Sequence, residues 1–323
     1  MTARVDPDLA RILPLLPLKD AATLTPKRAR NELVALAESR KDVPLPELAS
    51  VRDITLDGAA GAIAARVYAT GRTPAPTVVY FHGGGWVAGD LFTHERQART
   101  LALELDAVVV SIDYRRPPET PFPGAYEDCL AATRWAARNI GTLGGDAARL
   151  AVAGDSAGGN LAAAVAQGCR DGGGPALKAQ FLIYPATDLA GCYGAPAANA
   201  KYPSRQENAE GYFLTGDSMR FFAGHYLPRP KDSEDPRASP LLGKTLANLP
   251  PAVICTAEFD PLRDEGEAYA DALKRAGVEV AYFREPGMVH GYFGMGAASP
   301  AANAARQRAT AAFKAMLDGT TRR

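Results

Sequence analysis

Short hydrophobic runs alternate with longer segments of helical periodicity from about Val51 onward. Several of the short runs are apolar at almost every position instead of every second one, which is typical of strands buried on both faces. We therefore expect an α/β fold with a mostly parallel sheet covered by helices on both faces. The predicted strands are Arg52–Leu56, Ala62–Tyr68, Thr77–Phe81, Ala107–Ile112, Leu150–Ala153, Gln180–Tyr184, Ala252–Thr256 and Glu279–Arg284.

Helices are expected between many of these strands and after the last one. Two pieces do not fit the alternation: residues 1–48, which contain two short predicted helices, and an insertion at about 187–233. The expected organisation is an N-terminal cap segment, 1–48, and a catalytic domain, 49–323, that carries the insertion. The predicted helices of the catalytic domain are Thr93–Leu105, Pro123–Asn139, Ser156–Gly168, Leu262–Ala276 and Ala301–Leu317.

The insertion is rich in aromatic residues, and two interpretations of it stay open. It is either additional hydrophobic core or a lid over an apolar pocket, and the sequence pattern favours neither. Its aromatic residues are Tyr193, Tyr202, Tyr212, Phe213, Phe221, Phe222 and Tyr226.

Composition and charge restrict the kind of partner. The 36 basic residues balance the 36 acidic ones, and no run of like charge stands out, so a nucleic-acid or anionic-membrane partner is not expected. The strongest apolar runs are strand-length, far below the roughly 18 residues of a membrane span. Asp6, Asp8 and nearby prolines disfavour a secretory signal. We expect a cytoplasmic protein that acts on a small molecule.

The four cysteines are widely and irregularly spaced, with no CxxC pair and no histidine at metal-ligand spacing. Such cysteines are typical of reduced packing residues. Neither a disulfide nor a metal site is expected.

The segment LAVAGDSAGGNLAAAVA, residues 150–166, carries the candidate nucleophile. An apolar run ends in G-x-S-x-G, with Gly154 and Gly158 on either side of Ser156, and alanine-rich sequence of high helix propensity follows. Strand, sharp turn and helix are the context that this motif requires. The turn would expose the Ser156 hydroxyl and place the Ala157 amide at a helix N-terminus, facing a substrate.

A serine hydroxyl needs a base within hydrogen-bond reach and a third group that orients the base. In hydrolases of this architecture the order along the chain is Ser, then Asp or Glu, then His, which leaves His225 and His290. His290 is favoured because it follows the last predicted strand and would open on the same sheet edge as Ser156. For the acid, Asp260 is favoured because it directly follows a strand. Asp264 and Glu265 remain as competitors in the first turn of the next helix.

The glycine run at 83–85 follows a strand and formally fits G-x-G-x-x-[GA], the dinucleotide fingerprint. The next helix begins near Thr93, too far away for its N-terminus to hold a pyrophosphate. The glycines are better explained as a loop of exposed amides near Ser156. Such amides can donate to the oxyanion that forms in an acyl-transfer reaction.

Five motifs in this order resemble the bacterial hormone-sensitive-lipase-like esterases, family IV of the lipolytic enzymes, within the α/β-hydrolase fold. They are HGGGW at 82–86, DYRRPPETPFPGAYED at 113–128, GDSAGGN at 154–160, DPLRDEG at 260–266 and HGY at 290–292.

The resemblance implies an eight-stranded sheet with a cap built from the N-terminal segment and the insertion. It implies Ser156, Asp260 and His290 as the catalytic triad. The implied oxyanion hole consists of the amides of Gly83, Gly84 and Ala157, and His82 is implied as the structural support of that loop. Asp155 places the sequence with the GDSAG branch, some of whose members form dimers through the edge of the last strand.

Two departures from the family pattern stand out. Family members commonly read DYRLAPE, so Arg116 and Pro117 replace an apolar residue and an alanine, and the packing against the glycine loop is expected to differ. Tyr292 stands where many relatives have Phe, which predicts a hydroxyl near the pocket.

The expected activity is hydrolysis of short- to medium-chain acyl esters through an acyl-enzyme intermediate, with no metal and no cofactor. An amidase or deacetylase on the same triad is an alternative, because the triad does not distinguish ester from amide. A non-catalytic small-molecule-binding homologue is a second alternative, although such proteins typically lack the triad histidine, which is present here as His290.

Overall fold

An eight-stranded sheet forms the centre of the protein, and the computed structural model describes residues 4–18 and 22–320. The spatial order is β1-β2-β4-β3-β5-β6-β7-β8. β1 and β2 pair antiparallel, as do β2 and β4, and every later pair is parallel, which confirms the expected fold class. The strands are β1 Ser50–Gly58, β2 Gly61–Ala69, β3 Ala75–Phe81, β4 Val108–Ile112, β5 Gly145–Asp155, β6 Gln180–Ile183, β7 Ala252–Phe259 and β8 Val280–Val289.

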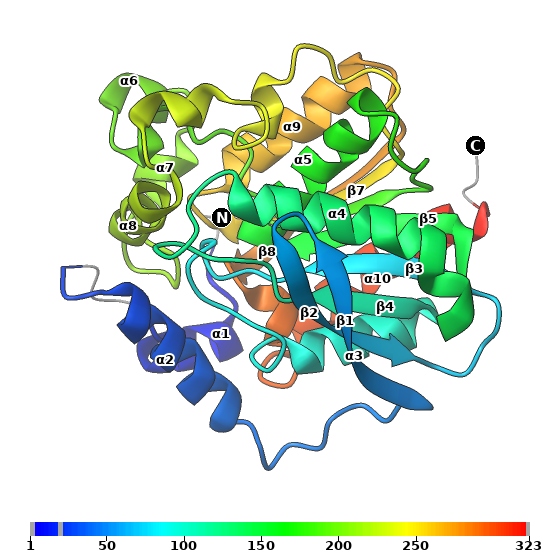
Figure 1. Ribbon diagram of the computed structural model, residues 1–323. Coiled ribbons are helices and arrows are strands. Elements are labelled where there is room, and N and C mark those ends of the chain that lie inside the picture. The colour runs from blue at the N-terminus through cyan, green and yellow to red at the C-terminus, as the bar shows by residue number, and fades with distance from the viewer. Residues whose placement is uncertain (1–3, 19–21, 321–323) are drawn as a thin grey trace.

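Helices cover both faces of the sheet (Figure 1). One hydrophobic core lies beneath α4, α5 and α9, and a second lies beneath α3 and α10 on the opposite face. β3 lies between these cores and is buried at every position, which explains its continuous apolar sequence. The covering helices are α3 Glu95–Leu105, α4 Gly124–Asn139, α5 Ala157–Asp171, α9 Arg263–Arg275 and α10 Pro300–Asp318.

The N-terminal segment and the insertion lie at the same end of the molecule, on the left in Figure 1. The N-terminal segment contains α1 (Pro7–Ile12), a short 3₁₀ turn and α2 (Pro26–Glu38). The insertion contains α6 (Pro196–Asn199), α7 (Ser204–Glu207) and α8 (Gly216–Tyr226), joined by irregular loops and 3₁₀ turns. Residues 1–3 and 19–21 of the expected N-terminal cap segment, and residues 321–323, fall outside the described part of the chain.

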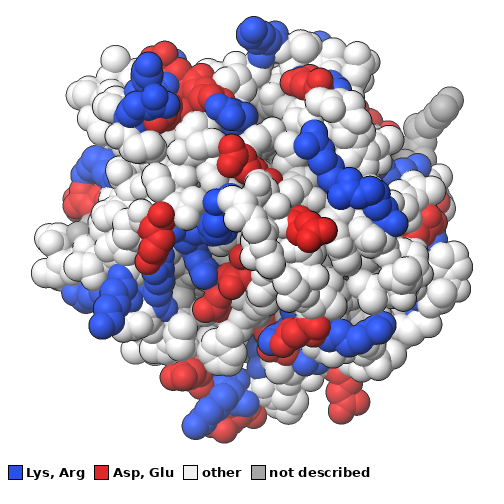
Figure 2. Space-filling view, viewed as in Figure 1, with Lys and Arg blue, Asp and Glu red and all other residues white. Residues whose placement is uncertain are grey.

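Basic and acidic side chains are interspersed over the face shown in Figure 2, as the balanced composition predicts. Within residues 4–18 and 22–320, no helix combines the length and the apolar character needed to cross a membrane.

Candidate active site

Ser156 sits on the sharp turn that joins β5 to α5. Its φ of 58° and ψ of −119° lie outside the helical and extended regions, as the strained turn of a G-x-S-x-G motif requires. The flanking glycines are needed for space, because a Cβ on Gly158 would overlap the carbonyl of Phe81 and one on Gly154 would overlap the backbone of Gly158. The turn therefore exposes the Ser156 hydroxyl at the carboxyl end of the sheet.

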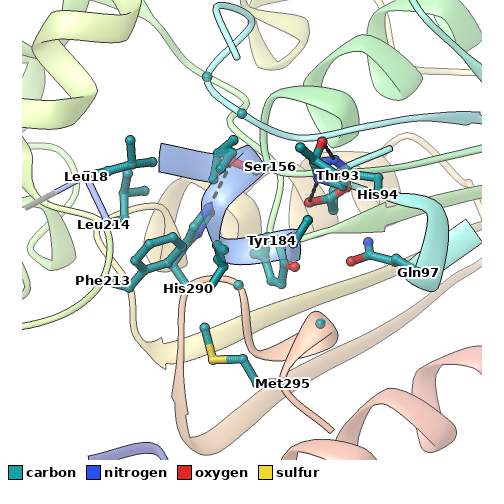
Figure 3. Close-up of a pocket in the computed structure, with 18 of the residues that line it drawn as sticks. Leu18, Thr93, His94, Gln97, Ser156, Tyr184, Phe213, Leu214, His290 and Met295 are labelled. Carbon is teal, nitrogen blue, oxygen red and sulfur yellow. Dashed lines mark hydrogen bonds and ion pairs between the residues drawn. The ribbon is translucent and has the colours of Figure 1, made fainter. Parts of the chain in front are cut away.

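His290 lies in contact with Ser156 (Figure 3), and Asp260 contacts the other nitrogen of the same imidazole. Nε2 of His290 is 2.9 Å from Oγ of Ser156, and Nδ1 of His290 is 2.7 Å from Oδ2 of Asp260. The amide of Leu262 donates to the other Asp260 oxygen at 2.9 Å, and the ring of Tyr184 packs against the imidazole at 4.6 Å between centroids. Asp260 is fully buried and His290 nearly so, which holds the imidazole in one orientation.

The competing candidates lie elsewhere. His225 is on α8, where its Nδ1 lies 2.9 Å from the carbonyl of Phe221 one turn earlier. Asp264 accepts from the Ser204 amide, and Glu265 pairs with Arg205. Of the alternatives that the sequence left open, the structure joins only Asp260 and His290 to Ser156.

The glycine loop differs from the expectation at one residue. The amide of Gly83 donates to Oδ1 of Asp155 at 3.0 Å, so this amide already has an acceptor, and the expectation that it lines an oxyanion hole is wrong. Gly84 and Gly85 line the pocket instead. The amides of Gly84, Gly85 and Ala157 have no protein acceptor among the residues the structure describes, so all three are available to a ligand oxygen.

Glycine is required at both of these loop positions. Gly84 has a φ of 117° and Gly85 a φ of 61°, which place both in the region that favours glycine. An added Cβ on Gly84 would overlap the carbonyl of Ala88, and one on Gly85 would overlap the ring of Phe222 in the insertion. The loop thus combines an unusual backbone path with close contact on both sides.

His82 lies beneath the loop and is fully buried. Its Nδ1 is 2.8 Å from the carbonyl of Gly83, and its ring stacks on Tyr114 at 4.3 Å between centroids. Because a carbonyl only accepts, Nδ1 carries the proton. Burial, together with the neighbouring His94 and Arg116, lowers the pKa of His82 well below its usual range. His82 is therefore a neutral donor to the loop, not a base beside Ser156.

Trp86 and Asn160 anchor the same loop, and sequence reasoning gave neither a role. The indole of Trp86 stacks on Tyr226 at 4.5 Å and donates to Oδ1 of Asn160 at 3.2 Å. The Asn160 amide group in turn donates to the carbonyls of Ala186 and Ala238, at 2.9 and 2.7 Å. The only sequence signal was their position in the HGGGW and GDSAGGN motifs, because the contacts join segments far apart in the chain.

Arg116 and Tyr292, which depart from the family pattern, lie in different surroundings. The Arg116 guanidinium donates to the carbonyl of Gly89 and pairs with Asp113 at 3.0 Å, so it packs against the glycine loop through polar contacts. Tyr292 is fully buried beneath Tyr184 and does not line the pocket. The predicted hydroxyl near the pocket is therefore wrong, because the ring points into the core.

A cavity of about 170 Å³ lies over Ser156 and His290. The N-terminal segment contributes mainly aliphatic side chains to its wall, and the insertion contributes Phe213, Leu214 and Phe222. Figure 3 shows Phe213 and Leu214 on one side of Ser156, and Thr93, His94 and Gln97 on the other. Tyr193 and Tyr226 of the insertion are buried in the core. The aromatic insertion thus supplies both additional core and a wall of the pocket.

The fold and the contacts of Ser156 define an α/β hydrolase, and a family model described as alpha/beta hydrolase fold matches residues 78–294. The chain belongs to the hormone-sensitive-lipase-like esterases, family IV of the lipolytic enzymes.

Two relatives in Mycobacterium tuberculosis illustrate the similarity. Esterase LipI is 40% identical over 325 residues, which cover 98% of this chain and 96% of the relative. Carboxylesterase NlhH is 43% identical over 321 residues, which cover 97% and 96%. Among solved structures, the hyperthermophilic esterase from Pyrobaculum calidifontis has a TM-score of 0.90 at 40% identity, covering 97% of this chain and 99% of that one.

Proposed function

We propose that the carboxylesterase activity of this protein is carried by Ser156 as nucleophile, His290 as general base and acid, and Asp260 as the group that orients His290. The observation that carries the proposal is the continuous set of contacts from Ser156 Oγ through His290 to the buried Asp260, at 2.9 and 2.7 Å. The esterases among the relatives support the choice of ester as substrate.

In this mechanism Oγ of Ser156 attacks the acyl carbon while Nε2 of His290 takes the hydroxyl proton. Asp260 accepts from Nδ1 of His290, fixes the tautomer and stabilises the imidazolium. His290 then protonates the leaving alcohol, and a water deprotonated by His290 releases the acid from Ser156. No step of this mechanism requires a metal or a cofactor.

The oxyanion that forms during attack is stabilised by the amides of Gly84, Gly85 and Ala157. Each is a main-chain donor with no protein acceptor among the described residues, and all three line or adjoin the cavity over Ser156. Donors fixed in advance need no reorganisation as charge develops on the carbonyl oxygen. Asp155 and His82 act as supports, since they hold the Gly83 end of the loop from below.

The substrates are small esters with short to medium acyl chains. A cavity of about 170 Å³ with aliphatic and aromatic walls supports this range. Cleavage of amides, or removal of acetyl groups, on the same triad is not favoured by the relatives, whose names describe esterases. A non-catalytic binding role is disfavoured because His290 is present and contacts Ser156.

The cap is formed by the N-terminal segment together with the insertion, because both contribute walls to the cavity. A homodimer through β8 is part of the proposal. The support for it is that β8 pairs with β7 on one side and ends the sheet on the other among the described strands. The cytoplasmic location and the absence of a nucleic-acid partner remain predictions from the sequence.

The proposal is tested by p-nitrophenyl butyrate hydrolysis with the wild-type protein and with Ser156→Ala. We expect the variant to lose at least about 10⁴-fold in kcat while its circular dichroism spectrum and melting temperature stay close to wild type. A matching p-nitroanilide measures amide cleavage in parallel. If Ser156→Ala keeps most of the ester hydrolysis, Ser156 is not the nucleophile. If the wild type cleaves the anilide faster than the ester, the amidase alternative is favoured.

A further inference from the structure

Two arginines that have no acidic partner among the described residues lie beside the substrate cavity. Arg40 follows the end of α2, and Arg96 lies on the first turn of α3. Both line a second cavity of about 510 Å³, and Arg40 lines the cavity over Ser156 as well. The two cavities adjoin, since they share the residues Arg40, Thr93, Gln97, Gly294 and Met295.

Neither guanidinium has a carboxylate within ion-pair distance among residues 4–18 and 22–320. In the part of the chain that the structure describes, no aspartate or glutamate lines the second cavity. The third arginine there, Arg306, is different, because it pairs with Glu104. The second cavity therefore has two positive charges at its wall that no described acidic side chain neutralises.

The hydrogen bonds of the pair show which donors remain free. Arg96 donates to main-chain carbonyls of the segment after α2, including that of Pro44 at 2.7 Å. To the described residues, the Arg40 guanidinium makes a single long hydrogen bond, 3.3 Å, to the carbonyl of Gly294. Most of the five N–H donors of the Arg40 guanidinium are thus unused. Arg96 holds the backbone that carries Arg40 and adds its charge.

The electrostatic environment favours a bound anion. Burial and, secondarily, the neighbouring charge of Arg96 lower the pKa of Arg40, which nevertheless stays a cation at any physiological pH. Two like charges in a partly desolvated cleft repel each other and lose hydration, and an anion between them would offset both costs. A planar guanidinium matches a carboxylate with two parallel hydrogen bonds.

We propose that Arg40, supported by Arg96, forms a subsite for a carboxylate at the end of the substrate remote from the scissile ester. The substrates of the enzyme then include esters that carry a free carboxylate, such as monoesters of dicarboxylic acids. The inference rests on the proposed esterase function and names a substrate class for the same site. The wall shared by the two cavities places the carboxylate subsite in continuity with Ser156.

The test compares charged esters with neutral analogues of the same shape. Monoethyl adipate is paired with ethyl adipamate, in which a primary amide replaces the carboxylate. The acetate ester of ω-hydroxyhexanoate is paired with its primary amide. The first pair places the charge on the acyl side of the ester and the second on the alcohol side. The readout is the ratio of kcat/KM for the charged ester to that for the neutral one, at low ionic strength.

We expect Arg40→Gln to lower this ratio about tenfold in at least one pair, mainly through KM, because a charge-assisted hydrogen bond is lost. Arg40→Lys keeps the positive charge but not the paired N–H donors of the guanidinium, so it should lower the ratio less than Arg40→Gln does. Arg138→Gln is the matched control, since Arg138 is exposed on α4 and lies outside both cavities. Its ratio should equal that of the wild type.

Salt gives a second measurement that needs no variant. About 0.5 M NaCl should lower the wild-type ratio, because it screens the charges of the subsite. An unchanged ratio in Arg40→Gln for both pairs, or a wild-type ratio insensitive to salt, would overturn the carboxylate subsite. Such a protein would still hydrolyse p-nitrophenyl butyrate. Failure of the wild type on that ester as well would instead overturn the proposed function itself.

Discussion

Asp155, the residue before Ser156, determines which amides of the glycine loop are available to a substrate. Its carboxylate accepts from the amide of Gly83 and from the hydroxyl of Tyr80, and it lies at the wall of the cavity. The motif letters alone do not show this, because the contact depends on the register in which Phe81 of β3 pairs with Gly154 of β5. The sequence therefore pointed to the glycine loop, but it did not show that the Gly83 amide is bound to Asp155 or that Gly85 lines the cavity.

His82 is a single residue that makes the stability of the folded protein depend on pH. Its pKa in the folded protein lies well below the ordinary value of about 6.5, chiefly because it is buried. Between those two values the unfolded chain binds more protons than the folded protein, so the free energy of unfolding falls as pH falls. The contribution is fully present above about pH 6.5 and is lost on acidification toward the folded-state pKa.

The measurement is urea unfolding of the wild type and of His82→Asn, whose amide can still donate to the loop. From about pH 6.5 to 5, the wild type should lose stability relative to the variant, at up to about 1.4 kcal/mol per pH unit. His225→Asn, at a half-buried position of α8, serves as the control. Parallel stability curves for wild type and His82→Asn would contradict a neutral buried imidazole.

Among the secondary-structure elements, the strands and main helices follow the hydrophobic pattern, and the errors occur at their ends. The structure confirms each of the eight predicted strands, but β8 continues to Val289, well beyond the predicted end. Pro286 and Gly287 suggest a loop, yet an edge strand tolerates a proline and the β7–β8 register shift absorbs the irregularity. His290 consequently follows the strand directly and reaches Ser156.

The insertion is fixed to the main domain by a buried ion pair between α7 and α9. Arg205 pairs with Glu265 at 2.6 Å, with exposed side-chain fractions of 2% and 0%. The guanidinium is also sandwiched between Tyr193 and Tyr202, at 4.5 and 4.4 Å from their ring centroids. Sequence reasoning treated Glu265 only as a competitor for the catalytic acid, because its partner is distant in the chain.

Removing one partner should therefore be costly. We expect Glu265→Gln to lower the free energy of unfolding by about 3–5 kcal/mol, because it leaves the buried Arg205 charge without the carboxylate that pairs with it. The double variant Arg205→Met with Glu265→Met should recover part of that loss. Asp217→Asn, in an exposed pair on α8, should cost under about 1 kcal/mol. Urea unfolding measures all three, and a Glu265→Gln loss as small as that of Asp217→Asn would contradict the role of the pair.

Across the whole molecule, the fold and the meeting of Ser156, Asp260 and His290 could be predicted for one physical reason. The carboxyl ends of parallel strands meet at one edge, so residues that directly follow β5, β7 and β8 converge whatever their separation in sequence. The shape of the cavity could not be predicted, because its walls come from the N-terminal segment and the insertion, which pack without a repeating pattern. The pairing of Arg40 with Arg96 beside the cavity could not be predicted from the sequence for the same reason.

In the proposed mechanism, Ser156 is the residue that becomes acylated. Diethyl p-nitrophenyl phosphate tests it most directly, since it transfers a phosphoryl group to an activated serine, releases p-nitrophenol and cannot be readily hydrolysed from the enzyme. Intact mass and peptide mapping should show a single diethylphosphoryl group, on Ser156, and its amount should match the loss of p-nitrophenyl butyrate hydrolysis. Inactivation with the label on another residue, or full activity with Ser156 labelled, would contradict the account.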